Sequence, residues 1–374
     1  MTQAGLLVRK TDNTGTVLEF FDPIRARLPF PLMQEHCSIN NLPTAQGWDK
    51  LLVKLEEEIQ ISAARSAQID QALATIFRET ISVGTRAVKV FRLPPDEAPL
   101  IAARLAEFAP EDSPFMATYP RPIDSNELAV MPAGVFLCDV GRPEQDGSTT
   151  LVFCGRRILE EREARTRAQL GDAAVNQFGW GQYDEFVFVR RRYVQSFEIV
   201  RVDVTRALLE LRVEDHSGVD SGSALEQLQV KVNGLLAPHF GMQLQLVNPI
   251  NLFPAIKALY DDQAAGIVVE LGFTTDTGSS KHEKMRSSRA DLRLEQFHVG
   301  GKAAVNGILT PFRVAVRWAE EGQRTQEEVL LPGSIRMLGS AHPYLDHMVL
   351  SGALTEAKMQ ATLQRVVDHL PAPE

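Results

Sequence analysis

Apolar and polar residues alternate along many segments of the chain, the pattern of strands that bury one face. In the first half and just beyond it, this pattern predicts strands over 83–93, 129–140, 148–153, 184–192, 196–204 and 207–215. Farther along, it predicts a second sheet with strands over 267–272, 291–297, 312–318 and 327–331. Polar turn residues separate neighbouring strands, which favours hairpins and antiparallel pairing.

Other segments repeat apolar residues at intervals of three and four, which predicts amphipathic helices over 44–59, 62–80, 98–108, 223–238, 252–260 and 355–370. The segment 156–168 is almost wholly polar and is interpreted as a further helix. Residues Glu160 to Arg167 carry both signs of charge, which pairs four residues apart can neutralise on a helix.

Consecutive hairpins without regular strand–helix alternation indicate an α+β protein rather than a doubly wound fold. The length of 374 residues suits two domains. We expect an N-terminal α+β domain over 1–170, a linker or loop over 171–182 and a C-terminal α+β domain over 183–374. Each domain is expected to be a mainly antiparallel sheet with helices packed on one face.

The segment 265–318 holds the densest set of side chains that could contact a charged ligand. Arginine presents a planar fork of donors that matches phosphate oxygens. The sequence therefore predicts a polyanion-binding surface formed by Lys281, Lys284, Arg286, Arg289, Arg293, Arg313 and Arg317. The alternative is a solvated sheet face whose charges pair across strands, each pair contributing only ~0.2–1 kcal/mol.

Two features near the expected linker are also open to two interpretations. The run Arg190 to Arg192 at a strand end is either a second phosphate contact or a simply solvated patch. Trp180, between the glycines of the loop, either forms a contact surface or tucks under the loop. We favour the second for Trp180 because aromatic area drives burial.

Composition narrows the classes of protein. With 44% hydrophobic and 23% charged residues the chain is expected to be globular, and its net charge of −9 argues against a wholly basic nucleic-acid binder. Its three cysteines are far apart, without zinc-type spacing, so we expect reduced core thiols and no metal. No secretion signal or membrane span is evident, which predicts a cytoplasmic protein.

One catalytic hypothesis is a metal-dependent phosphodiesterase. Glu270, Asp276 and Asp291 would hold the metal, and Lys281 or Lys284 would steady the attacking water. The usual nuclease pattern places a lysine two residues after the strand glutamate, and none follows Glu270 at that spacing. The match to this class of enzyme is therefore incomplete.

Other catalytic patterns fail more clearly. His282 and Lys284 begin a phospholipase-type pair, but Arg289 stands where the aspartate belongs, and 277–281 is only a fragment of a phosphate loop. His282 and His298 are expected to be structural, because catalysis demands partners in reach. No serine or cysteine occupies a nucleophile elbow.

The sequence is best explained by a non-enzymatic binding or assembly subunit that needs no cofactor and contacts nucleic acid or another polyanion through its C-terminal half. Two alternatives stay open. One is the metal-dependent phosphodiesterase or nuclease. The other is a protein–protein interaction subunit, with another protein or a second copy as partner, for which the charged face is irrelevant.

Overall fold

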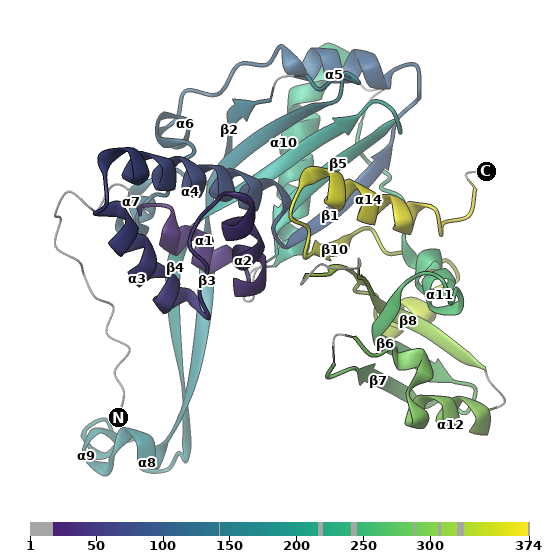
Figure 1. Cartoon of the computed structure of the whole chain (residues 1–374). Coiled ribbons are helices and arrows are strands. Elements are labelled where there is room, and N and C mark those ends of the chain that lie inside the picture. The colour runs from purple at the N-terminus through teal and green to yellow at the C-terminus, as the bar shows by residue number, and fades with distance from the viewer. Residues whose placement is uncertain are drawn as a thin grey trace.

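The computed structural model describes residues 18–372, except 142, 216–219, 241–244, 288, 306–307 and 320–324. Ten strands form one antiparallel sheet in the order β2-β3-β4-β5-β1-β10-β9-β8-β6-β7 (Figure 1), which confirms the α+β class. The strands are β1 (Arg86–Arg92), β2 (Val135–Val140), β3 (Thr149–Thr166), β4 (Glu185–Asp203), β5 (Leu208–Glu214), β6 (Ile267–Thr275), β7 (Ser280–Lys284), β8 (Leu309–Trp318), β9 (Glu327–Leu331) and β10 (Met348–Ser351).

The described helices precede, interrupt and follow these strands. They are α1 (Phe21–Arg27), α2 (Phe30–Ile39), α3 (Trp48–Ile59), α4 (Ala63–Val83), α5 (Ala98–Ala106), α6 (Pro114–Thr118), α7 (Ser125–Val130), α8 (Arg167–Leu170), α9 (Asp172–Gln177), α10 (Ser221–Phe240), α11 (Phe253–Asp261), α12 (Gln296–Ala304), α13 (Ile335–Leu338) and α14 (Glu356–Val367), with a 3₁₀ turn, η2 (Leu292–Leu294). Among the described residues, no helix combines the length and apolar character needed to cross a lipid bilayer.

Helices cover both faces of the half of the sheet that contains β1 to β5. Alternate residues of β4, such as Phe197 and Ile199, pack with α1 to α4 in one core. Val200 and Val202 face the opposite way and pack with α5 and α10 in another. The structure thus adds a covered second face to the prediction of helices on one face.

The other half of the sheet buries its apolar face under α11 and α14, in a core that also includes residues of β1 and β5. A buried ion-pair cluster helps to seat α14. Nη2 of Arg212, a fully buried side chain on β5, lies 2.7 Å from Glu210 Oε2 and 2.6 Å from Glu356 Oε1 at the start of α14. Burial opposes ionisation of Glu356, but Arg212 outweighs it and holds the pKa of Glu356 at about 2.

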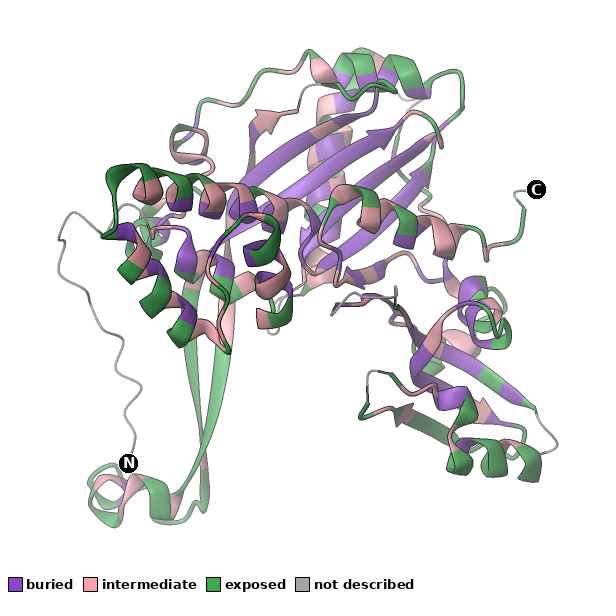
Figure 2. Cartoon of the chain, viewed as in Figure 1, coloured by how far each residue is buried: buried purple, intermediate pink, exposed green. Residues whose placement is uncertain are grey.

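Strands β3 and β4 continue beyond the body of the protein as a projecting two-stranded arm, residues 157–194, which ends in α8 and α9 (Figures 1 and 2). The prediction of a helix over 156–168 is therefore wrong, because these residues belong to β3 as far as Thr166. Their charges pair across the arm, as Glu160 does with Arg191, or two residues apart on β3, as Glu163 does with Arg165, rather than along a helix.

The expected linker, 171–182, is the tip of this arm, and strands from both expected domains hydrogen-bond within one sheet. The division into two domains is thus not confirmed. Within the C-terminal half, the predicted strands over 267–272, 312–318 and 327–331 are confirmed. The strand over 291–297 is wrong, because η2 and the start of α12 occupy those residues.

Candidate polyanion-binding surface

Strand β7 forms one edge of the sheet, with β6 as its strand neighbour. Lys281 and Lys284 on this strand are exposed, as are Arg286 and Arg289 in the loop that follows. Lysine on an edge strand also discourages unwanted strand pairing. Cations that only protect the sheet edge can be paired with neighbouring acids, whereas cations that bind a ligand must have charge left over.

Three side chains converge on Glu270, a buried carboxylate in β6. His282 Nε2 and Lys284 Nζ lie 3.0 and 2.9 Å from its oxygens, and Arg313 Nε donates to it at 2.5 Å. Burial raises the pKa of Glu270, but these hydrogen bonds outweigh burial and lower it to about 2. One negative charge thus faces the two permanent positive charges of Lys284 and Arg313.

The neighbouring cations Lys281, Arg286 and Arg289 form no ion pair with any acid in the part of the chain that the structure describes. Glu283, the acid between them in sequence, instead contacts His298 Nδ1 at 2.6 Å. Positive charge is therefore in excess along this edge. We call it the β7 basic surface, formed by Lys281, Lys284, Arg286, Arg289 and Arg313.

Helix α12 is fixed beside β7 by a buried polar chain. His298, 2% exposed, contacts Glu283 through Nδ1 and the Tyr260 hydroxyl through Nε2, at 2.9 Å. Lys302 Nζ donates to the same hydroxyl at 3.1 Å. Both ring nitrogens of His298 thus have partners, and these contacts join α12 to β7 and α11.

Two large apolar side chains at the start of α12 are exposed: Leu294, in η2 just before the helix, is 74% accessible and Phe297, in its first turn, is 70% accessible. The sequence reasoning missed them, because it placed both in a strand. Phe297 belongs to the helix that His298 joins to β7, and proteins that hold single-stranded nucleic acid combine cations with aromatic rings on which bases stack. The capping residue Glu295, whose carboxylate accepts from the His298 N–H at 2.8 Å, was the available signal for a helix.

Two of the predicted site residues are engaged elsewhere. Arg293 is buried, contacts Asp291 through Nε and Nη2, and donates to the backbone carbonyls of Asp262 and Gly266. Its inclusion among the surface residues is corrected, because its donors hold the chain together. Arg317 pairs with Glu328 on β9 and is about a quarter exposed.

The residues of the nuclease hypothesis do not meet. Glu270 is surrounded by cations, Asp276 is exposed in the turn after β6, and Asp291 is occupied by Arg293. Among the described residues, no three His, Cys, Asp or Glu side chains are grouped so that they could hold a metal ion.

The second predicted cationic patch, Arg190 to Arg192, lies on the arm. Arg191 Nε donates to Glu160 at 3.1 Å, and Arg192 Nε donates to Glu161 at 2.8 Å. Two of the three arginines are therefore paired with acids of the opposite strand, which supports the interpretation as a solvated face.

Comparison with known proteins adds no family to these observations, because no protein-family model matches the chain and no curated protein is similar to it in sequence. The functional conclusion therefore depends on the charges and contacts of this chain.

Proposed function

We propose that the protein is a binding subunit that contacts a phosphate-bearing polyanion, with nucleic acid as the leading candidate, through the β7 basic surface. The observation that carries this proposal is the set of exposed, unpaired cations at 281, 286 and 289, next to two more that share one carboxylate. If these cations served only to stabilise the fold, neighbouring acids would be expected to pair with them. Excess positive charge on a protein of net charge −9 favours a localised contact rather than general coating of nucleic acid.

The geometry also suggests how the contact is divided. Phosphates bind to flexible, exposed Lys and Arg side chains and fix position, whereas Phe297 offers a ring on which a base can stack. Glu270 limits this contact, because its one negative charge pairs with both Lys284 and Arg313 and offsets part of their charge. Single strands are therefore expected to bind more tightly than duplexes.

We test this by fluorescence anisotropy with labelled single-stranded DNA, duplex DNA and RNA at low and moderate salt. Each phosphate contact releases counterions, so affinity should fall steeply as salt rises. Arg286→Glu/Arg289→Glu should lose at least about tenfold in affinity, because two contacts become repulsive.

The matched control is Lys50→Glu/Lys54→Glu on α3, which changes the net charge by the same amount at exposed positions. It should retain most of the affinity. Absence of binding to all three probes at low salt contradicts the proposal, as does an equal loss in both variants.

The expectation of a cytoplasmic location also stays a proposal. It is supported by the three cysteines, which are buried and free. Burial raises the pKa of Cys37 to about 12, so this thiol is unreactive near neutral pH. Thiol labelling of the denatured protein, recovered from its native cell, should count three free thiols. Oxidised cysteines would contradict the proposal.

A further inference from the structure

The arm is a ribbon whose outer edges have no strand neighbours. Pairing of β3 with β2 stops at Gly155, and pairing of β4 with β5 begins at Ile199, so 157–194 contains only the two strands of the arm and its tip. Ten residue pairs at about 3.3 Å each give the ribbon a length of roughly 33 Å. A two-stranded hairpin is at best marginally stable in water, so a ribbon this long calls for a partner.

Protection of the β4 edge stops where the arm leaves the body. At the root, Ser125 Oγ donates to the Tyr193 carbonyl at 3.1 Å, and Arg27 Nη2 donates to the Gln195 carbonyl at 2.7 Å. Within the described chain, no side chain caps the β4 backbone in this way between residues 185 and 192. Uncapped strand edges are templates for pairing with another chain.

The tip of the arm exposes a cluster of aromatic rings. Phe178 stacks on Trp180 with ring centroids 4.7 Å apart, and Trp180 lies 5.6 Å from Phe186. Phe178 remains 59% and Trp180 38% exposed, so the rings cover each other only in part. The expectation that Trp180 tucks under the loop is therefore met only in part, because its ring contacts Phe178 and Phe186 but stays exposed.

Exposed large apolar side chains are unusually dense in the arm. Seven of those in the described chain fall between residues 158 and 189, whereas soluble proteins usually scatter such side chains singly. They are Ile158, Phe178, Trp180, Tyr183, Val187, Phe188 and Val189. This density points to a contact surface rather than to a solvated spacer.

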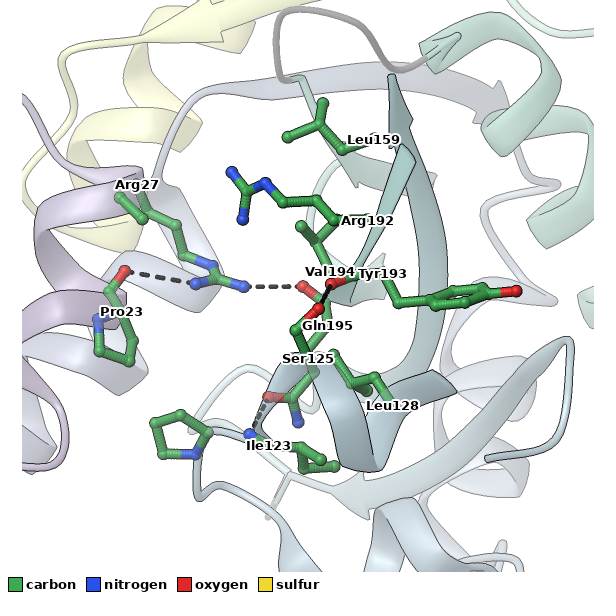
Figure 3. A pocket seen from close by; sticks show the side chains of 12 residues that line it. Pro23, Arg27, Ile123, Ser125, Leu128, Leu159, Arg192, Tyr193, Val194 and Gln195 are labelled. Carbon is green, nitrogen blue, oxygen red and sulfur yellow. Dashed lines mark hydrogen bonds between the residues drawn. The ribbon is translucent and has the colours of Figure 1, made fainter. Parts of the chain in front are cut away.

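The root of the arm is hollowed. A pocket of about 380 Å³ lies between α1, the segment that leads into α7, and the root of the arm, where Leu128 and Leu159 line it (Figure 3). Ala26 and Pro122 add further apolar groups to its lining. Arg192 and Gln195 supply polar groups at its wall. A hollow of this size and lining can receive an aromatic side chain.

Along β4, apolar residues stand at both ends of the arm and charged residues stand between them. Apolar residues at the root, including Leu159 and Val194, are followed by the ion-paired band around Arg191, then by Val187 and Phe188 and the aromatic tip. Two such arms lying side by side in opposite directions align apolar ends with apolar ends. Within the charged band, Glu160 and Glu161 contact Arg191 and Arg192, which reduces the charge that the band brings to its copy.

We propose that the partner of the arm is a second copy of this chain: two arms lie antiparallel about a two-fold axis, and each aromatic tip enters the pocket at the root of the other arm. Twofold symmetry makes both tip-to-root contacts form together, because tip and root are the two ends of the same element. The β7 basic surface lies at the far edge of the sheet and stays free in this dimer.

Light scattering of the purified full chain should give twice the mass of one chain between about 1 and 100 µM, the range in which an interface of modest affinity is populated. Phe178→Ser/Trp180→Ser should weaken the dimer at least about tenfold, since buried aromatic anchors dominate such interfaces. Ala26→Gln on α1 should also weaken it, because the longer side chain enters the pocket without touching the arm's own fold. The matched control is Ile61→Ser/Val230→Ser, which removes two exposed apolar side chains elsewhere.

Disulfide cross-linking between single added cysteines tests the tip-to-root contact. The three native cysteines do not interfere, because they are buried. Gln182→Cys at the tip and Ser125→Cys at the root should form an intermolecular disulfide when the two variants are mixed and oxidised, and neither should do so alone. A monomer throughout the concentration range overturns the proposal, as does a monomer that binds phosphatidylcholine–phosphatidylglycerol vesicles through its tip. Cross-linking of the tip variant to itself also overturns it.

Discussion

The arm and the β7 edge both carry clustered arginines and lysines, yet their charges are in different states. On the arm, the strand register places Glu160 opposite Arg191 and Glu161 opposite Arg190, so acids and bases alternate across the ribbon. At the β7 edge, the single carboxylate of Glu270 serves several cations, and Lys281, Arg286 and Arg289 gain no partner from the described residues. A count of charges in sequence therefore says little about availability, because pairing across strands decides which cations can meet a ligand.

The largest expected effect is on ligand affinity. Lys281→Glu/Arg286→Glu/Arg289→Glu should reduce affinity for single-stranded nucleic acid by at least about 100-fold at low salt, because three phosphate contacts become repulsive. Arg191→Gln/Arg192→Gln should change it less than about threefold, since Glu160 and Glu161 already pair with these arginines. Anisotropy titrations of both variants measure the difference.

An equal loss of affinity in the two variants of this pair would show that the arm, too, contacts the ligand. The distinction between the two regions would then be wrong.

Removing the shared carboxylate should act on both stability and binding. Glu270→Gln leaves Lys284 and Arg313 without their shared negative charge, and we expect a loss of about 2–4 kcal/mol in the free energy of unfolding, because a buried ion pair that loses one partner is destabilised. Affinity for the polyanion should rise severalfold, because Lys284 and Arg313 are released. Urea unfolding and anisotropy test the two effects independently, and a fall in affinity at unchanged stability would contradict this role of Glu270.

Acidification should destabilise the protein through the same group. The pKa of Glu270 is about 2 in the folded protein, because the hydrogen bonds from Arg313, Lys284 and His282 outweigh the opposing effect of burial. Its folded pKa lies below the ordinary value of 4.5, so its contribution is complete above about pH 4.5 and is lost as pH falls toward 2.

Glu356, with a pKa of about 2 in the folded protein, acts in the same window. Unfolding free energies measured between pH 6 and 3 should therefore fall toward acid, and Glu270→Gln should flatten part of that fall. A slope unchanged by this substitution would refute the assignment.

The smallest effect is expected on the arm. Glu160→Gln removes one partner of the exposed Arg191 and Arg162, and solvent screens both pairs. The urea midpoint should not shift measurably, and polyanion affinity should change less than about twofold. A clear rise in affinity would mean that the arm's cations can bind the polyanion once an acidic partner is removed.

Much of the secondary structure could be predicted locally. The strand over 327–331 is confirmed to the residue, and the helices over 223–238 and 355–370 correspond to α10 and α14, because their apolar spacing directly reflects the face that they bury. Where the local pattern suits two structures, it misled. Residues 156–168 carry mixed charges that could pair four apart on a helix, whereas in the protein they pair with β4.

The site was predicted in part. The local sequence indicated an excess of cations after β6, and the structure has that excess. The sequence could not show that Arg293 is buried against Asp291 and backbone carbonyls. It also missed the exposed Phe297, because 291–297 alternates as a strand would, although Asp291 and Glu295 are both capping residues.

The sequence by itself determined the α+β class, the amphipathic elements and the local excess of charge, because each depends on the order of neighbouring residues. Only the tertiary structure decided that the strands join one sheet, that 157–194 projects as an arm, and which cations remain unpaired. The reason is physical: a charge is neutralised by whatever lies within a few ångströms. Glu270 and Arg313, 43 positions apart in sequence, come within 2.5 Å only when β6 and β8 pair.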